Sequence, residues 1–113
     1  MIVLVCGGRT YDDNIKLSAI LDAYGPQISL LIHGGARGAD KLAGEWAERH
    51  GVPVRVFPAN WDQQHSSAGP IRNQQMLDQG KPDMVIAFPG DRGTADMVKR
   101  AKIARIKVRE VDP

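Results

Sequence analysis

Residues 2–9 read IVLVCGGR, and this stretch decides the fold. The apolar run Ile2-Val3-Leu4-Val5-Cys6 is typical of a strand that is covered on both faces. Gly7 and Gly8 follow directly, and glycine permits both a tight turn and a close approach of the backbone to its neighbours. The stretch therefore predicts the first strand and the first strand-to-helix loop of a parallel α/β sheet.

Four more apolar runs follow, at residues 28–32, 52–57, 84–88 and 106–111. The last run alternates apolar with charged residues, as an edge strand does. Helical patterns fill the gaps, so strands and helices alternate along the whole chain. This alternation predicts a Rossmann-like three-layer fold with helices on both faces of a five-stranded parallel sheet. We expect the strand order 3-2-1-4-5, with the topological switch between strands one and four.

Four helices are expected between the strands. Apolar residues recur at helical spacing over residues 17–24 and 39–50, and Gly25-Pro26 and Gly51 end these two helices. Pro70 suits the first turn of a third helix, which ends at Gly80. Thr94 is the expected N-cap of the fourth helix.

The composition is typical of one cytoplasmic domain spanning residues 1–113. The net charge is only +2, and the 15 Lys and Arg residues are spread along the chain, which gives no strong case for nucleic acid. We find no signal peptide and no apolar run long enough for a membrane span. One cysteine cannot form an internal disulfide, which favours a reducing compartment. The three histidines lie too far apart for a metal site, and no cofactor motif is present.

Three strand ends are rich in glycine, and the expected strand order makes them neighbours. Backbone N–H groups and helix N-termini at such ends favour phosphate, so we expect a nucleotide-type ligand there rather than simple tight turns. Neither a P-loop nor a standard dinucleotide fingerprint is present. The expected binding residues in these loops are Gly7, Gly8, Arg9, Gly34, Gly35, Ala36, Gly38, Asp40, Pro89, Gly90, Gly93 and Thr94.

A fourth segment contributes Arg72 and Asn73, which we expect in the first turn of the third helix, near the loop after strand four. A guanidinium there suits a phosphate or ribose, although pairing with a structural carboxylate is the alternative. Trp61 either stacks on a base or covers the end of the core, and the second interpretation is slightly favoured.

Together these segments resemble the YspA-type, YpsA-related family of the SLOG superfamily. The resemblance rests on Gly7-Gly8-Arg9, residues 34–40, Ala59-Asn60-Trp61, residues 69–73 and the Pro89-Gly90…Gly93-Thr94 loop. It covers essentially the whole chain and implies a Rossmann-like fold that senses or processes nucleotide-derived molecules.

Two relatives within the superfamily indicate which activities have to be compared. Lonely-guy phosphoribohydrolases carry P-G-G-x-G-T-x-x-E and an arginine that Arg72 resembles, but Met97 stands where their catalytic glutamate belongs. Asp96 and Asp40 are the substitute carboxylates, and together with Arg72 they are the catalytic candidates. We expect Asp96 to point about 100° away from the Met97 position. The DNA-processing protein DprA has a loop that residues 34–40 resemble.

The sequence therefore predicts a sensor or binding module for a ligand such as AMP, ADP-ribose or an NAD-like molecule. A phosphoribohydrolase-like N-glycosidase is the first alternative, and DprA-like nucleic-acid binding is the second. Whether the chain is an enzyme stays open at this stage. The resemblance also allows a homo-oligomer.

Overall fold

The computed structural model describes residues 1–113 and holds a five-stranded parallel sheet in the order β3-β2-β1-β4-β5. The predicted fold class and strand order are both confirmed. The strands are β1 (Ile2–Cys6), β2 (Leu30–His33), β3 (Val54–Val56), β4 (Met84–Ala87) and β5 (Lys107–Glu110). Strand β1 lies at the centre, paired with β2 on one side and β4 on the other.

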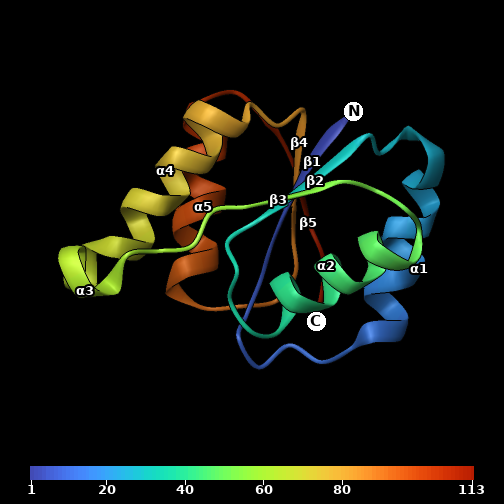
Figure 1. The fold of residues 1–113 in the computed structure, drawn as a ribbon, viewed down its shortest axis with the longest axis horizontal. Coiled ribbons are helices and arrows are strands. Elements are labelled where there is room, and N and C mark those ends of the chain that lie inside the picture. The colour runs from blue at the N-terminus through green and yellow to red at the C-terminus, as the bar shows by residue number, and fades with distance from the viewer.

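Helices cover both faces of the sheet (Figure 1). One face carries α1 (Asn14–Tyr24) and α2 (Ala39–Arg49), and the other carries α4 (Ala68–Gly80) and α5 (Arg92–Ile103). Successive β1 residues point to opposite faces, so Val3 and Val5 pack with α1 and α2, whereas Leu4 and Cys6 pack with α4 and α5. Two apolar clusters, one on each face, thus hold the sheet between its helices.

The central and edge strands differ in burial as their sequences indicate. Strand β4 is buried along its whole length, while β5 exposes three of its four residues. Strand β3 is short and exposed, which shortens the predicted run at 52–57. Strand β2 begins two residues later than predicted because Gly25–Gln27 forms a 3-10 turn and Ile28 caps it.

Two short elements lie between β3 and α4 that the sequence did not predict. They are α3 (Trp61–Gln64) and the 3-10 turn η2 (His65–Ser67). Helix α3 is capped by Asn60, whose side-chain oxygen accepts a hydrogen bond from the backbone N–H of Gln63. Four residues are too few to show a helical period, so these elements left no pattern in the sequence.

The predicted N-cap of the fourth helix is wrong. Helix α5 begins at Arg92, and Asp91 is its N-cap residue with φ −116° and ψ −132°. The backbone N–H of Ala95 donates to the Asp91 carbonyl, which places Thr94 inside the first turn. Helix α5 thus begins three residues earlier than predicted, and Met97, Val98 and Ala101 form its buried face.

None of the helices combines the length and the apolar character that crossing a bilayer requires.

Candidate functional site

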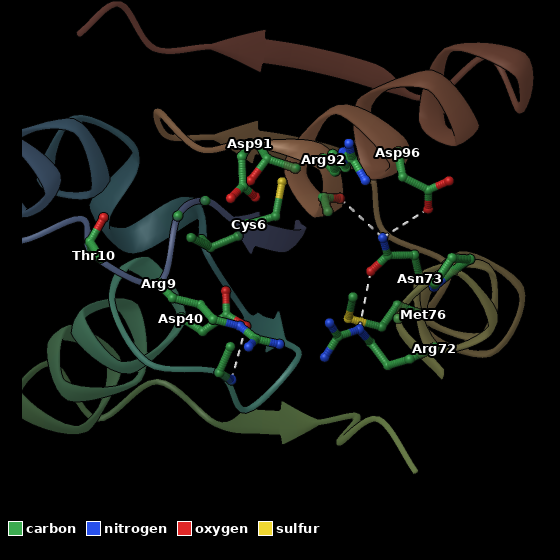
Figure 2. Close-up of a pocket in the computed structure, with 18 of the residues that line it drawn as sticks. Cys6, Arg9, Thr10, Asp40, Arg72, Asn73, Met76, Asp91, Arg92 and Asp96 are labelled. Atoms are coloured by element: carbon green, nitrogen blue, oxygen red, sulfur yellow. Dashed lines mark hydrogen bonds between the residues drawn. The ribbon is translucent and has the colours of Figure 1, made fainter. Parts of the chain in front are cut away.

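The carboxyl ends of β1, β2 and β4 border a cleft of about 470 Å³, hereafter the main cleft (Figure 2). This is the switch point of the sheet, where open α/β folds place their ligands. The segment from Trp61 to Met76 forms the opposite wall and brings α4 against the loops. Four sequence-distant segments therefore converge here.

The three glycine-rich loops are locked to one another by backbone hydrogen bonds. The Gly8 N–H donates to the Pro89 carbonyl at 2.9 Å, and the Ala39 N–H donates to the Gly8 carbonyl at 3.2 Å. A Cβ atom on Gly38 would collide with the Gly8 carbonyl oxygen, and one on Gly90 would lie 2.7 Å from the Gly8 nitrogen. These glycines therefore permit loops to touch, a role that ligand approach alone does not explain.

Gly93 differs from the other loop glycines. A Cβ there would have no heavy atom within 4 Å, and the residue lines the main cleft. Close packing within the protein therefore does not require glycine at this position.

Asp40 organises the loop after β2. Its Oδ2 accepts hydrogen bonds from the N–H groups of Gly34 at 3.1 Å and Ala36 at 3.2 Å. The side chain is almost fully buried on the wall of the main cleft. Burial raises the pKa of Asp40 to about 6, although the two amide hydrogen bonds and the Arg72 charge oppose the rise. It does not cap α2, whose N-cap is Gly38.

Arg72 lies against the loop after β2, not the loop after β4 as predicted. Its Nη1 donates to the Gly34 carbonyl at 2.7 Å, and its Nε donates to Asn73 Oδ1 at 3.1 Å. Because α4 begins at Ala68, Arg72 falls in the second turn, which turns it toward β2. No carboxylate lies within ion-pair distance of it, so structural pairing is ruled out.

Asn73 takes the place near β4 that Arg72 was expected to have. Its amide donates to the Gly93 carbonyl at 3.2 Å and to Asp96 Oδ2 at 3.0 Å (Figure 2). Arg100 Nε also donates to Asp96 Oδ2, at 2.8 Å. Burial acts to raise the pKa of Asp96, but the hydrogen bonds from Arg100 and Asn73 outweigh it and hold the pKa below its usual value.

Asp96 and Met97 point in different directions, as the angle of about 100° between neighbouring helix positions predicts. Asp96 lines the main cleft, whereas Met97 is completely buried among the apolar residues under α4 and α5. One residue along a helix turns the side chain by about 100°, and here that turn carries position 97 into the core. Of these two positions, 96 places its side chain in the main cleft and 97 does not.

The start of α5 opens onto the main cleft. Arg92, Gly93 and Thr94 all line it, and Asp91 makes no side-chain capping hydrogen bond. The first-turn N–H groups therefore lack a protein acceptor, which leaves the positive end of the helix dipole available to an anion. Helix α1 differs, since Asp13 caps it with a hydrogen bond from the Lys16 N–H.

Trp61 does not cover the core, which corrects the interpretation favoured from the sequence. It is 45% exposed and lies beside Arg9, whose guanidinium carbon is 5.5 Å from the centre of the indole ring. Both side chains line the main cleft and also the smaller pocket next to it. An exposed indole at a cleft offers a flat surface for a base or sugar.

A side pocket of about 330 Å³ adjoins the main cleft. It is lined by Arg9, Arg37, Arg72 and Trp61 together with loop residues 34–36 and 58–59. Four residues, including Arg9 and Arg72, line both spaces. The two pockets therefore share a wall.

Most of the site residues expected from the sequence meet in the main cleft: Gly7, Gly8, Arg9, Ala36, Asp40, Arg72, Asn73, Gly93, Thr94 and Asp96. Gly34 and Gly35 line the side pocket, and Pro89 and Gly90 line a third, smaller pocket. Gly38 lines none of these three and serves the contact with Gly8. Sequence reasoning missed Thr10, Ser66 and Arg92, of which Arg92 stands inside the glycine-rich loop it had singled out.

Cys6, at the end of β1, is unsuited to chemistry. It is buried, and burial with the nearby Asp40 charge raises the pKa of its thiol to about 12. Its thiol is therefore a poor nucleophile. His50 lies at the other end of α2, which it caps, with its ring stacked on Trp46.

Known proteins resemble this chain in fold and in sequence. A crystal structure of UDP-GlcNAc 2-epimerase from Neisseria meningitidis bound to UDP-GlcNAc matches with a TM-score of 0.59 at 18% identity. The match covers 97% of this chain and 31% of the epimerase, so this chain spans about a third of that protein and shares its Rossmann-like fold. The Gene 61 protein of Mycobacterium phage D29 is 34% identical and aligns with 94% of this chain and 92% of its own length. Residues 1–64 match the family model named YspA, cpYpsA-related SLOG family. This protein belongs to that family.

Proposed function

We propose that the main cleft binds a nucleotide-derived ligand and that the protein acts as a sensor or binding module for it. The observation that carries the proposal is the charge around the cleft. Arg9, Arg72 and Arg92 line it, and none of the three forms an ion pair within the protein. Cationic groups left unpaired at a concave surface favour an anionic ligand.

The rest of the cleft supports the same ligand chemistry. A phosphoryl group suits the uncapped start of α5, where N–H groups lack protein acceptors. The exposed face of Trp61 suits the base or the sugar. A volume of about 470 Å³ is within the range of small-molecule sites.

A thermal-shift screen tests the proposal. AMP, ADP-ribose, NAD and cyclic nucleotides are compared with adenosine, which lacks the phosphate. At 100 times its dissociation constant, a ligand that binds only the folded state adds about 2.7 kcal/mol to the free energy of unfolding. We expect at least one phosphorylated compound to raise the melting temperature, with adenosine much weaker.

Arg72→Ala and Arg49→Ala form a matched pair for the screen. Losing a charged hydrogen-bonding partner costs about 1.5–3 kcal/mol, so Arg72→Ala should weaken binding by roughly ten- to a hundredfold. Arg49 is exposed at the end of α2 and lines neither pocket, so its variant should bind normally. The absence of any response at millimolar nucleotide would refute the proposal.

Hydrolysis of an N-glycosidic bond is the second candidate, and the position of Asp96 favours it. An ionised carboxylate in the cleft suits an oxocarbenium-like transition state. Two donors already bind this carboxylate through the same oxygen, which is why we rank binding first. The same incubations, analysed by chromatography, separate the two. We expect intact ligand; free base that is lost in Asp96→Asn would make the protein a hydrolase.

A further inference from the structure

The two adjoining pockets differ in charge. The main cleft is lined by three arginines and by three aspartates, Asp40, Asp91 and Asp96. The side pocket is also lined by three arginines, Arg9, Arg37 and Arg72, but by no acidic residue. The side pocket is therefore the more strongly positive of the two, although it is the smaller.

The arginines of the side pocket have no anionic partner in the protein. None of the three takes part in an ion pair. Arg72 donates only to uncharged acceptors, the strongest being the Gly34 carbonyl, and Arg9 lies over the Trp61 ring. Figure 2 shows Arg9 and Arg72 extending toward one another from opposite walls. Two like charges that converge repel each other, and an anion between them reduces that repulsion.

The charge of Arg9 affects the pKa of Arg72. Burial is the main cause that lowers the pKa of Arg72, the Asp40 charge opposes it, and the Arg9 charge lowers it further. Asp40 is a single carboxylate beside these two guanidinium groups, and its Oδ2 also accepts the Gly34 and Ala36 N–H groups. The positive charge at the shared wall is therefore incompletely balanced within the protein.

The side pocket and the main cleft share part of their lining. Arg9, Ala36, Trp61 and Arg72 line both, and the Arg9 and Trp61 side chains lie against one another there. Arg9 makes no hydrogen bond or ion pair that would fix it, and its contact with the indole is its one specific interaction. A ligand that occupies the main cleft can therefore extend past these side chains toward Arg37.

We propose that the side pocket is a second anionic subsite of the same binding site, so that the ligand carries two negatively charged groups. One group lies at the start of α5 in the main cleft, and the other lies among Arg9, Arg37 and Arg72. The ligand class is a nucleotide with a second phosphoryl group, as in a nucleoside diphosphate derivative or a bisphosphate, rather than a monophosphate. This inference rests on the proposed function and names the ligand class of that site.

Affinity measurements with defined probes test the inference. The probes are AMP, ADP and adenosine 3′,5′-bisphosphate, measured by isothermal titration calorimetry at one ionic strength. ADP places its phosphoryl groups next to each other, whereas the bisphosphate separates them. At least one of the two should bind about tenfold or more tightly than AMP, because each additional charged hydrogen bond contributes to affinity.

Arg37 provides the specific variant, because it lines only the side pocket, is exposed, and makes no hydrogen bond within the protein. For the tighter-binding of ADP and the bisphosphate, Arg37→Ala should reduce the ratio of its affinity to that of AMP toward one. Arg37→Lys, which keeps the charge, should restore part of the ratio. Arg49→Ala, with an arginine removed from the far end of α2, should leave the ratio unchanged.

The outcomes separate this inference from the proposed function. Equal affinities for all three probes, or a ratio that Arg37→Ala does not change, would refute the second subsite while nucleotide binding stands. A loss of the ratio with Arg49→Ala as well would also refute it, since the effect would then be one of net charge. No binding of any probe would refute the proposed function itself.

Discussion

At the scale of single residues, Asp40 connects the fold to the site. It is the one acidic residue among the buried side chains, and its Oδ2 accepts hydrogen bonds from the backbone N–H groups of Gly34 and Ala36. An ionised carboxylate suits those two donors, but burial disfavours the charge. The balance leaves its pKa at about 6, above the ordinary value of 3.8.

This raised pKa predicts how stability depends on pH. The folded state holds the Asp40 proton more tightly than the unfolded state does, so the stabilisation is complete below about pH 4 and is lost as the pH rises through about 6. Over this window the contribution of Asp40 to the free energy of unfolding changes by roughly 3 kcal/mol. Urea denaturation of the protein and of Asp40→Asn at pH 4–7 should give free energies whose difference changes across that interval.

The comparison isolates Asp40 because His33, whose pKa burial lowers, titrates in both proteins. Asp62→Asn, which changes an exposed carboxylate in α3, is the control and should follow the original pH profile. Parallel pH profiles for the protein and Asp40→Asn would show that Asp40 titrates as it does in the unfolded chain.

At the scale of elements, α5 assigns neighbouring residues to different surroundings. Asp96 faces the main cleft and Met97 faces the sheet. Introducing the glutamate of the phosphoribohydrolase motif at position 97 would therefore bury a carboxylate, not equip the site. We expect Met97→Glu to destabilise the protein by about 3 kcal/mol or more, because an unpaired charge in the core is strongly unfavourable.

Thermal unfolding measures the effect of Met97→Glu against a control on the same helix. Ile103→Glu places the same side chain at a position that is 73% exposed, where the cost should stay below about 1 kcal/mol. A Met97→Glu protein that is as stable as the Ile103→Glu protein would mean that position 97 can reach solvent.

The elements that the sequence predicted well are those with a long pattern. Continuous apolar runs identified β1, β2 and β4 as the covered strands, and the alternating run identified β5 as an edge. Helix α3 was missed because four residues show no period. The direction of Arg72 depends on where α4 begins, and a difference of two residues along a helix turns a side chain by about 200°.

The location of the candidate site could be predicted from the sequence, but the contacts within it could not. Strand order alone brings the three loops together at the switch point. That Asn73 rather than Arg72 meets the β4 loop, and that Gly38 and Gly90 serve loop-to-loop contacts, depends on packing between segments far apart in the chain. The side pocket escaped prediction because Arg37, Pro58 and Trp61 share no local pattern.

At the scale of the whole molecule, the two tryptophans lie in different parts of the structure. Trp46 is completely buried in the cluster beneath α1 and α2, and its Nε1 donates to Asp22. Trp61 is exposed and lines both the main cleft and the side pocket. The core and the site therefore each carry one indole.

Alanine at either position should separate stability from binding. Trp46→Ala should cost about 3–5 kcal/mol, as truncation of a buried aromatic side chain does. Trp61→Ala should change the free energy of unfolding by less than about 1 kcal/mol and abolish the change in intrinsic fluorescence on adding ligand. Denaturation and fluorescence titration of both variants test this, and a ligand-dependent signal that survives in Trp61→Ala would place the ligand elsewhere.

The locked loops constrain how this family can diversify. Gly8 touches Gly38 on one side and Gly90 on the other, so the three loops form one piece although they come from residues far apart in the chain. A loop transplanted alone from another α/β protein would meet two neighbours shaped for a different backbone. A change in one of these loops therefore has to be matched in the other two, whereas side chains at the rim, such as Arg9, Arg37 and Trp61, can change without moving the backbone.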